Sequence, residues 1–204
     1  MAEFKVTYFD MAGSRGEDVR LALVIAGRTF EDIRVDREAF LKLKPELPFG
    51  SLPVLEVEGH GVFSQTNAIL RLIGRLCDLY PQEPFEAARH DALMDAVEDL
   101  RHRIGPTARI QDAAAKKAAR QQLATDLIPR WGEGVERLIG QGPFVGGERP
   151  GVADIKLYMA HRWLGSGVLD DIPKDVLDHC PKLEAVANGI ATHPAVRDWY
   201  AKAG

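Results

Sequence analysis

Cysteine is scarce in this chain. Cys77 and Cys180 are the only 2 among 204 residues, and they lie far apart, outside any Cys-x-x-Cys spacing. This pattern excludes a disulfide framework and gives no sign of a zinc site. We expect both side chains to be reduced thiols, as in a cytoplasmic protein.

Strong charge and long apolar runs are also missing. A net charge of only -4 excludes a broad electrostatic grip on nucleic acid or on an anionic membrane surface. No stretch reaches the roughly 18 uninterrupted apolar residues that suggest a membrane helix. The N-terminus, from Met1 to Val6, lacks the basic segment and apolar run of a signal peptide. We therefore expect a soluble, cytoplasmic protein whose partner is a small molecule, with no nucleic acid and no membrane involved.

The chain does contain enough apolar material, 46% of its residues, for one large or two small domains with real cores. Phe4, Val6 and Tyr8 alternate with polar residues, which predicts a strand that ends near Tyr8 at a turn. The elements expected next are a helix at 16–26, a strand at 30–35, a helical turn at 39–43, a hairpin at 52–63 and a helix from Ser64 or Gln65. A strand–helix–strand crossover gives a parallel pair and the hairpin adds antiparallel strands, which is a thioredoxin-like topology.

Strand signals almost disappear after the break at residues 78–84, and Ala, Leu, Arg and Glu recur at helical spacing. Pro129 is expected to kink or divide one of the later helices. The fold class predicted is therefore α/β plus all-α: a thioredoxin-like domain at residues 1–80, then a helical-bundle domain at residues 84–204. Its helices are expected near 84–110, 113–140, 152–164, 175–191 and 194–202.

Several fragments along the chain carry a more specific pattern. They are Tyr8-Phe9-Asp10-Met11 with Arg15-Gly16-Glu17 and Arg20, the run from Leu47 to Val57, the run from Ser64 to Arg71, Val152-Ala153-Asp154, and His193-Pro194-Ala195-Val196 before Trp199. In this order and spacing they resemble the sigma-class glutathione S-transferases, the class that includes the haematopoietic prostaglandin D synthases. The resemblance spans nearly the whole chain. It implies an enzyme that conjugates glutathione, its cosubstrate, to small apolar electrophiles and requires no metal.

The resemblance assigns the catalytic groups to the first turn. A free thiol has a pKa of about 8.5, so little of it is the nucleophilic thiolate at neutral pH. The Tyr8 hydroxyl is implied to donate a hydrogen bond to the glutathione sulfur, and Arg15 to add positive charge nearby. The turn between them is one residue longer than in the family pattern, so an insertion must be absorbed around Gly13 and Ser14. A solvated arginine is the alternative for Arg15.

The same resemblance assigns the carboxylate contacts of glutathione. Lys44 is implied to bind the glycyl carboxylate, while Phe40 replaces a tryptophan and so removes an N–H donor. Gln65 and Thr66 fall at a helix start, where free N–H groups and the positive dipole end attract the γ-glutamyl carboxylate. An N-terminal cap without a ligand is the alternative for this pair.

The segment before the hairpin is implied to bind the cysteinyl part of glutathione. In the family fold the bond before Pro53 is cis, which turns the backbone of Leu52 outward to pair with the ligand in strand fashion. Ser51 belongs to the same binding segment. An ordinary trans proline at the start of an edge strand is the alternative.

Asp99 matches the acidic residue that reaches across a homodimer to the glutamyl ammonium of glutathione. It lies in a helical run with Asp95 and Glu98, at spacings of three and four, so a solvated surface or a weak divalent-cation site are the alternatives. Asp154 matches the end of the family's helix-capping box, with Gly151 where Ser or Thr is usual, and is expected to be structural.

The electrophile pocket is implied to lie near Phe9, Met11, Arg103 and Pro106. Pro106 stands where the prostaglandin synthases carry an aromatic residue, so a glutathione-dependent prostaglandin isomerase is kept only as an alternative. A non-catalytic carrier or crystallin-like binding protein is another, although Tyr8 and the other matching glutathione residues favour an enzyme. No cysteine occurs near the first turn, which argues against a thiol-disulfide oxidoreductase or a cysteine-type transferase.

Overall fold

The computed structural model describes residues 4–202. The first residues, from which no signal peptide was expected, and the last two of the predicted helical domain lie outside this part. The described chain forms two compact units, one made of residues up to Gln82 together with those from Thr192 onward, the other of Glu83–Ala191. The predicted fold class is confirmed, since the first unit holds a four-stranded sheet and the second is helical.

Up to residue 82 the first unit follows the predicted order of strands and helices, and it also contains the last helix, which was expected in the helical domain. Its elements are β1 (Phe4–Phe9), α1 (Ser14–Ile25), β2 (Phe30–Val35), α2 (Arg37–Leu43), the short 3-10 helix η1 (Lys44–Glu46), β3 (Val54–Val57), β4 (Gly61–Ser64), α3 (Thr66–Leu76) and α9 (Pro194–Lys202). Along β1 the residues Phe4, Val6 and Tyr8 are buried and those between them are half-buried, as the alternation predicts. α1 ends before Gly27, whose φ of 64° suits a glycine after a helix.

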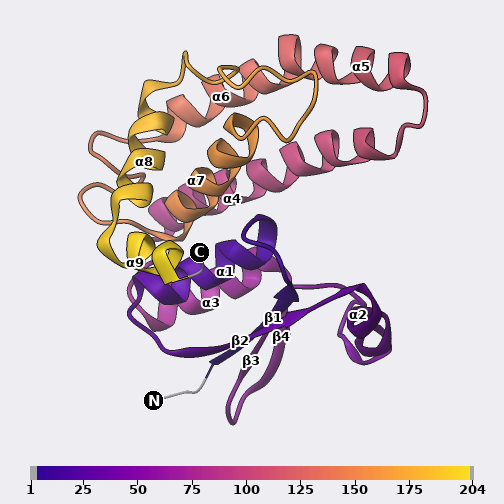
Figure 1. Ribbon diagram of the computed structural model, residues 1–204. Helices are drawn as coiled ribbons and strands as arrows, with labels where there is room; N and C mark the ends of the chain where they lie inside the picture. The colour runs from indigo at the N-terminus through magenta and orange to yellow at the C-terminus, as the bar shows by residue number, and fades with distance from the viewer. Residues whose placement is uncertain (1–3, 203–204) are drawn as a thin grey trace. The chain divides into compact units, whose positions relative to one another are not determined.

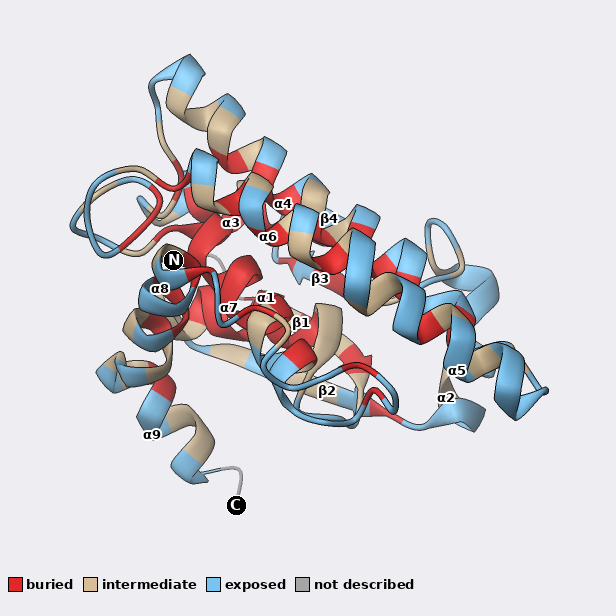
Figure 2. Ribbon diagram, turned by 90° about the horizontal axis from the view of Figure 1, so that it is seen from above, coloured by how far each residue is buried: buried red, intermediate tan, exposed pale blue. Residues whose placement is uncertain are grey.

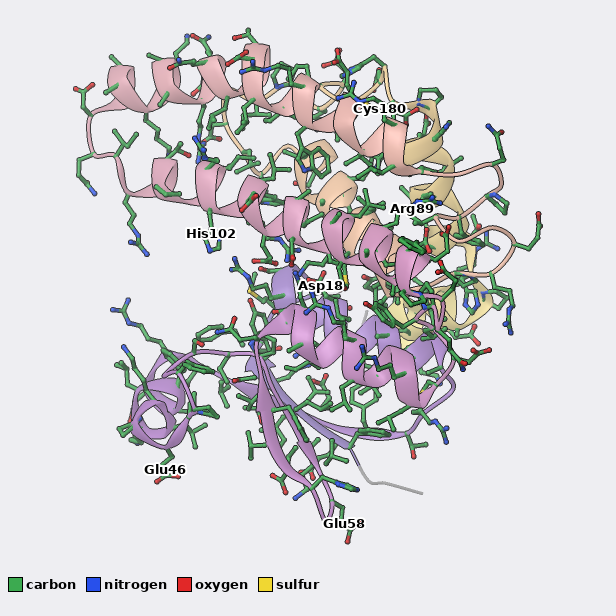
Figure 3. The ribbon with its side chains drawn as sticks, turned by 180° about the vertical axis from the view of Figure 1, so that it is seen from behind. Asp18, Glu46, Glu58, Arg89, His102 and Cys180 are labelled. Carbon is green, nitrogen blue, oxygen red and sulfur yellow. The ribbon has the colours of Figure 1, made fainter. Side chains whose placement is uncertain are left out.

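The sheet has the strand order β2-β1-β3-β4. β1 runs parallel to β2 and antiparallel to β3, and β3 pairs antiparallel with β4. α1 and α3 lie side by side on one face of this sheet, and α9 packs beside α1 (Figure 1). Glu58 marks the tip of the β3–β4 hairpin (Figure 3). The topology is therefore the thioredoxin-like one expected from the crossover and the hairpin.

The second unit is built from helices alone. They are α4 (Pro84–Ile104), the 3-10 helix η2 (Gly105–Arg109), α5 (Ala113–Gln122), the π-helical turn η3 (Leu123–Leu127), α6 (Ile128–Leu138), α7 (Val152–Gly165) and α8 (Pro181–Thr192). α7 is buried along most of its length (Figure 2). None of the helices in residues 4–202 has the length and apolar character needed to cross a membrane.

Proline shapes two helices of this unit, of which the division near Pro129 was expected and the late start of α8 was not. The helix expected at 113–140 contains the π turn η3 just before Pro129, because a proline inside a helix clashes with the preceding turn and the wider turn relieves this clash. The helix expected from residue 175 begins only at Pro181. Proline favours the first helical position and disfavours helix in the residue before it.

Asp154 anchors the start of α7. Its side chain is fully buried and accepts hydrogen bonds from the backbone N–H groups of Val145 and Gly151, both at 2.8 Å. Burial raises the pKa of this carboxyl to about 6, although the backbone N–H donors act to lower it. Asp154 therefore has the structural role that its position in the capping box predicts.

Candidate functional site

In the first unit, the residues assigned to glutathione binding lie next to strand ends, and these strand ends meet at one edge of the sheet. Phe9 at the end of β1 pairs with Val35 at the end of β2. Val54 at the start of β3 lies opposite Thr7 of β1 on one side and Ser64, the end of β4, on the other. Three connecting segments therefore leave or enter the sheet beside Tyr8. They carry Phe40 and Lys44, Ser51 to Pro53, and Gln65 with Thr66.

Tyr8 is closely packed and buried at this edge of the sheet. Only 6% of its surface is exposed, and its ring meets that of Phe9 edge-on with centroids 5.4 Å apart. Gly16 in the first turn of α1 lies directly against the ring, since a Cβ built on Gly16 would overlap it. The hydroxyl makes no hydrogen bond to another residue in the described part of the chain. Tyr8 is thus a fixed aromatic ring whose donor is open to a ligand.

Arg15 lies close to the turn that follows β1. It is the second residue of α1 and is half-buried. Ser14, the residue immediately before Arg15, adopts a φ of 59°, which is uncommon for a residue other than glycine. This left-handed residue lies in the turn where the resemblance implies one extra residue.

Phe40 and Lys44 lie in α2 and at the start of η1. The Phe40 ring is half-buried and meets the Phe9 ring edge-on, with centroids 5.1 Å apart. This contact ties α2 to the end of β1. Lys44 is exposed, and its stem runs beside Gly50, because a Cβ there would lie 3.4 Å from Lys44 Cε and Cγ. The ammonium group can therefore meet a carboxylate as a point charge.

The segment before β3 contains the expected cis peptide bond, between Leu52 and Pro53. Pro53 is buried, Leu52 is half-buried and Ser51 is exposed. The backbone of Ser51 and Leu52 lies just outside the strand ladder, which begins at Val54. Its polar groups are consequently placed where an extended ligand could pair with them.

The start of α3 has the features of an anion site. Gln65 precedes the helix with φ 69° and ψ 110°, and no side chain caps the first turn. Gln65 itself is exposed and Thr66 is buried. A backbone conformation this rare for glutamine is a marker of functional sites, and an uncapped first turn leaves N–H groups and the positive dipole end for a carboxylate.

The remaining predicted site residues belong to the second unit. Asp99 and Asp95 are exposed on α4, whereas the Glu98 carboxylate accepts hydrogen bonds from Lys156 Nζ at 2.6 Å and Arg101 Nη1 at 3.0 Å. Glu98 is therefore engaged inside the unit. Across residues 4–202 no group of three or more His, Cys, Asp or Glu side chains is arranged to hold a metal ion.

Arg103 lines a hollow of about 400 Å³ in the second unit, shared with Thr107, Ala119, Gln122, Leu123, Asp126, Leu127 and Arg130. Pro106 is exposed and does not line this hollow. In the first unit Met11 is 47% exposed, and Phe9 packs between Tyr8 and Phe40. Met11, Arg103 and Pro106 are therefore exposed, and Phe9 is the one half-buried member of the four residues assigned to the electrophile.

Gly16 and Trp199 had no predicted role at the site, and Arg20 had none beyond the resemblance. Arg20 is fully buried, and its guanidinium carbon lies 5.9 Å from the Tyr8 ring centroid. The spacing of Glu17 and Arg20 by three residues was the one available signal, since side chains at this spacing share a helix face.

Comparisons with known proteins identify similar sequences and structures. Residues 4–75 match the family model of the glutathione S-transferase N-terminal domain, and residues 98–203 that of the C-terminal domain. The chain is 30% identical to the haematopoietic prostaglandin D synthase of Gallus gallus, covering 99% of this chain and 97% of that protein. It is 43% identical to glutathione S-transferase 1 of Ascaris suum over 54% of this chain and 52% of that protein. Among solved structures, that of Na-GST-3 from Necator americanus, described as monomeric, matches with a TM-score of 0.80 and 26% identity over 98% of this chain and 97% of that chain.

Proposed function

The chain belongs to the glutathione S-transferase family, and from this premise we propose that it is a glutathione transferase that joins the thiolate of glutathione to small apolar electrophiles. The observation that carries the proposal is the position of Tyr8, buried at the end of β1 with Gly16 against its ring. The three segments beside it supply a cation, open backbone groups and a helix start, which are the groups that a tripeptide with two carboxylates requires.

Tyr8 is the catalytic donor in this proposal. Its hydroxyl donates to the glutathione sulfur and favours the thiolate over the thiol, since a hydrogen bond to the charged form lowers the pKa of a group. A decrease of about two units corresponds to roughly 2.7 kcal/mol, which one charge-assisted hydrogen bond with a nearby positive charge can supply. Arg15 provides that charge. The thiolate then attacks the electrophile and forms the carbon–sulfur bond of the conjugate.

The other residues hold glutathione in register with Tyr8. Lys44 binds the glycyl carboxylate, and Phe40 shapes the pocket beside it without donating a hydrogen bond. Ser51 and the backbone of Leu52, next to Pro53, bind the cysteinyl part in strand fashion. The γ-glutamyl carboxylate sits at the start of α3, bound by Gln65 and Thr66. In this scheme the cysteinyl sulfur lies nearest Tyr8.

We further propose a sigma-class homodimer in which Asp99 of each subunit binds the glutamyl ammonium in the site of the other. The exposure of Asp99 on α4 supports this, because a residue that serves a partner cannot be buried in its own subunit. Because the structure of Na-GST-3 is described as monomeric, the oligomeric state of this chain has to be measured. The cytoplasm is the proposed location, in keeping with two cysteines that are both free thiols.

The electrophile is proposed to contact Phe9, Met11, Arg103 and Pro106. A prostaglandin isomerase is the second candidate, favoured by the 30% identity to a prostaglandin D synthase. Pro106, however, stands where the resemblance places an aromatic residue in the prostaglandin synthases. General conjugation of apolar electrophiles therefore remains the first proposal.

Replacement of Tyr8 by phenylalanine tests this function. Tyr8→Phe keeps the ring that packs on Gly16 and removes only the hydroxyl, so the fold and glutathione affinity should persist while conjugation of a chlorodinitrobenzene-type electrophile falls steeply near neutral pH. An unchanged rate and pH profile would remove Tyr8 from the mechanism. A wild-type protein that binds glutathione but turns over no electrophile would indicate a carrier.

A further inference from the structure

Arg20 in the middle of α1 binds the backbone of the segment that follows Tyr8. Its Nη1 donates to the carbonyl of Met11 at 3.0 Å, and its Nη2 to the carbonyl of Phe9 at 3.5 Å. The side chain is fully buried, so the guanidinium needs these acceptors to compensate for its lost hydration. The Phe9 carbonyl also accepts from the Met11 N–H at 2.8 Å. A planar fork with several fixed donors suits this task, and the compact ammonium of lysine does not.

Two carboxylates fix the guanidinium from other directions. Arg20 Nε donates to Asp32 of β2 at 2.8 Å, and Nη1 also donates to Glu17 one turn earlier in α1 at 3.2 Å. Glu17 is fully buried as well. A buried charge is tolerated when it is paired and hydrogen-bonded, and removing one partner is costly. The orientation of Arg20 is therefore set by both carboxylates.

Trp199 of α9 completes this network from the far end of the chain. Its indole Nε1 donates to Glu17 Oε1 at 2.8 Å, while Arg20 takes the other carboxylate oxygen. The indole ring also packs against Phe30, with centroids 5.6 Å apart. A continuous path of hydrogen bonds thus runs from Trp199 through Glu17 and Arg20 to the backbone at Phe9 and Met11.

We infer that Arg20 is a positioning residue for Tyr8, and that Trp199 sets its orientation through Glu17, so the C-terminal helix α9 controls how well the tyrosine stabilises the thiolate. The inference rests on the proposed role of Tyr8. Neither residue touches glutathione in this scheme. Arg20 acts on the segment that begins at Phe9, and its guanidinium lies 5.9 Å from the Tyr8 ring centroid.

The test measures the pKa of enzyme-bound glutathione, followed by thiolate ultraviolet absorbance against pH, together with the melting temperature. Trp199→Phe keeps an aromatic ring beside Phe30 and removes the N–H donor together with part of the indole volume. Arg20→Lys keeps the charge and loses the fork. Arg34→Gln is the matched control, because Arg34 binds the same Asp32 at 2.9 Å and Asp10 at 3.1 Å but no backbone carbonyl of the segment.

Both Trp199→Phe and Arg20→Lys should raise the pKa of the bound thiol, Arg20→Lys by about one unit, which lowers the thiolate fraction below that pKa about tenfold. Arg34→Gln should leave the pKa unchanged. The inference is overturned if folded Trp199→Phe shows the wild-type pKa of bound glutathione while Tyr8→Phe raises that pKa. This holds even if Arg20→Lys fails to fold. If Tyr8→Phe itself leaves the pKa unchanged, the proposed function fails first and the inference falls with it.

Discussion

Gly16 and the Tyr8 ring are packed so closely that no side chain fits between them. A Cβ built on Gly16 overlaps Cγ and Cδ1 of Tyr8 and lies 2.6 Å from its Cβ. Real Cβ atoms do not approach other heavy atoms this closely, so one of the two elements must move to admit even a methyl group. The first turn of α1 therefore fixes the position of the Tyr8 ring.

Gly16→Ala should lower conjugation at least about tenfold, because a displacement of roughly 1 Å at a catalytic group can cost that much or more. Alanine itself is favourable in a helix, so any loss comes from the contact with Tyr8. Gly13→Ala is the control, since nothing lies within 4 Å of a Cβ at Gly13. Equal kcat/KM values for the two variants would show that the Tyr8 ring adapts without loss.

Local patterns were sufficient to predict the elements that carry the site. Alternation put Tyr8 at a strand end, and turn residues placed the hairpin and the helix near Gln65. The cis bond before Pro53 came from the resemblance alone, because composition and spacing do not distinguish it from a trans bond. The late start of α8 at Pro181 was missed, since the residues before it have helical composition but precede a proline.

The hydrogen-bond network of Trp199, Glu17 and Arg20 could not be predicted from the sequence, for a different reason. Glu17 and Trp199 are 182 residues apart, and nothing in a single sequence pairs two such positions. Glu17 and Arg20 are neighbours on one helix, but a surface pair would have the same spacing. Only the folded structure shows that Glu17 and Arg20 are both fully buried. Burial is what makes this ion pair a fixed part of the site and not an ordinary surface pair.

His90 and Asp154, two buried groups of the second unit, should change the stability of the protein in opposite directions as the pH is lowered. Burial lowers the pKa of His90 from 6.5 to about 4, so below pH 6.5 the unfolded chain binds a proton that the native chain refuses and stability falls as pH decreases. Burial raises the pKa of Asp154 from 3.8 to about 6, so over the same range the native chain holds a proton that the unfolded chain has lost. The two slopes have opposite sign and largely cancel.

His90→Gln should expose the contribution of Asp154. Relative to the wild type, its free energy of unfolding should rise as the pH is lowered from about 6.5 to 4.5, by up to about 1.4 kcal/mol per pH unit. Urea unfolding at a series of pH values measures this difference. His60→Gln, at an exposed position in the hairpin turn, should run parallel to the wild type. A His90→Gln curve parallel to both would mean that His90 titrates normally.

Asp99 should serve the site of the partner subunit. Asp99→Ala should raise the glutathione KM at least about tenfold, because a carboxylate facing the glutamyl ammonium makes a charge-assisted contact. Asp95→Ala is the matched control, one turn earlier on α4 and equally exposed. Equal effects of the two substitutions would reduce Asp99 to a solvated helix residue.

A mixed dimer separates action across the interface from action within one subunit. In a two-fold dimer each site joins Tyr8 of one subunit to Asp99 of the other. Co-expression of a Tyr8→Phe chain with an Asp99→Ala chain should then give heterodimers in which one site carries both defects and the other is intact. If Asp99 acted within its own subunit, each site would carry one defect. Purified heterodimers without a near-wild-type site, or an active monomer by light scattering, would contradict the cross-subunit arrangement.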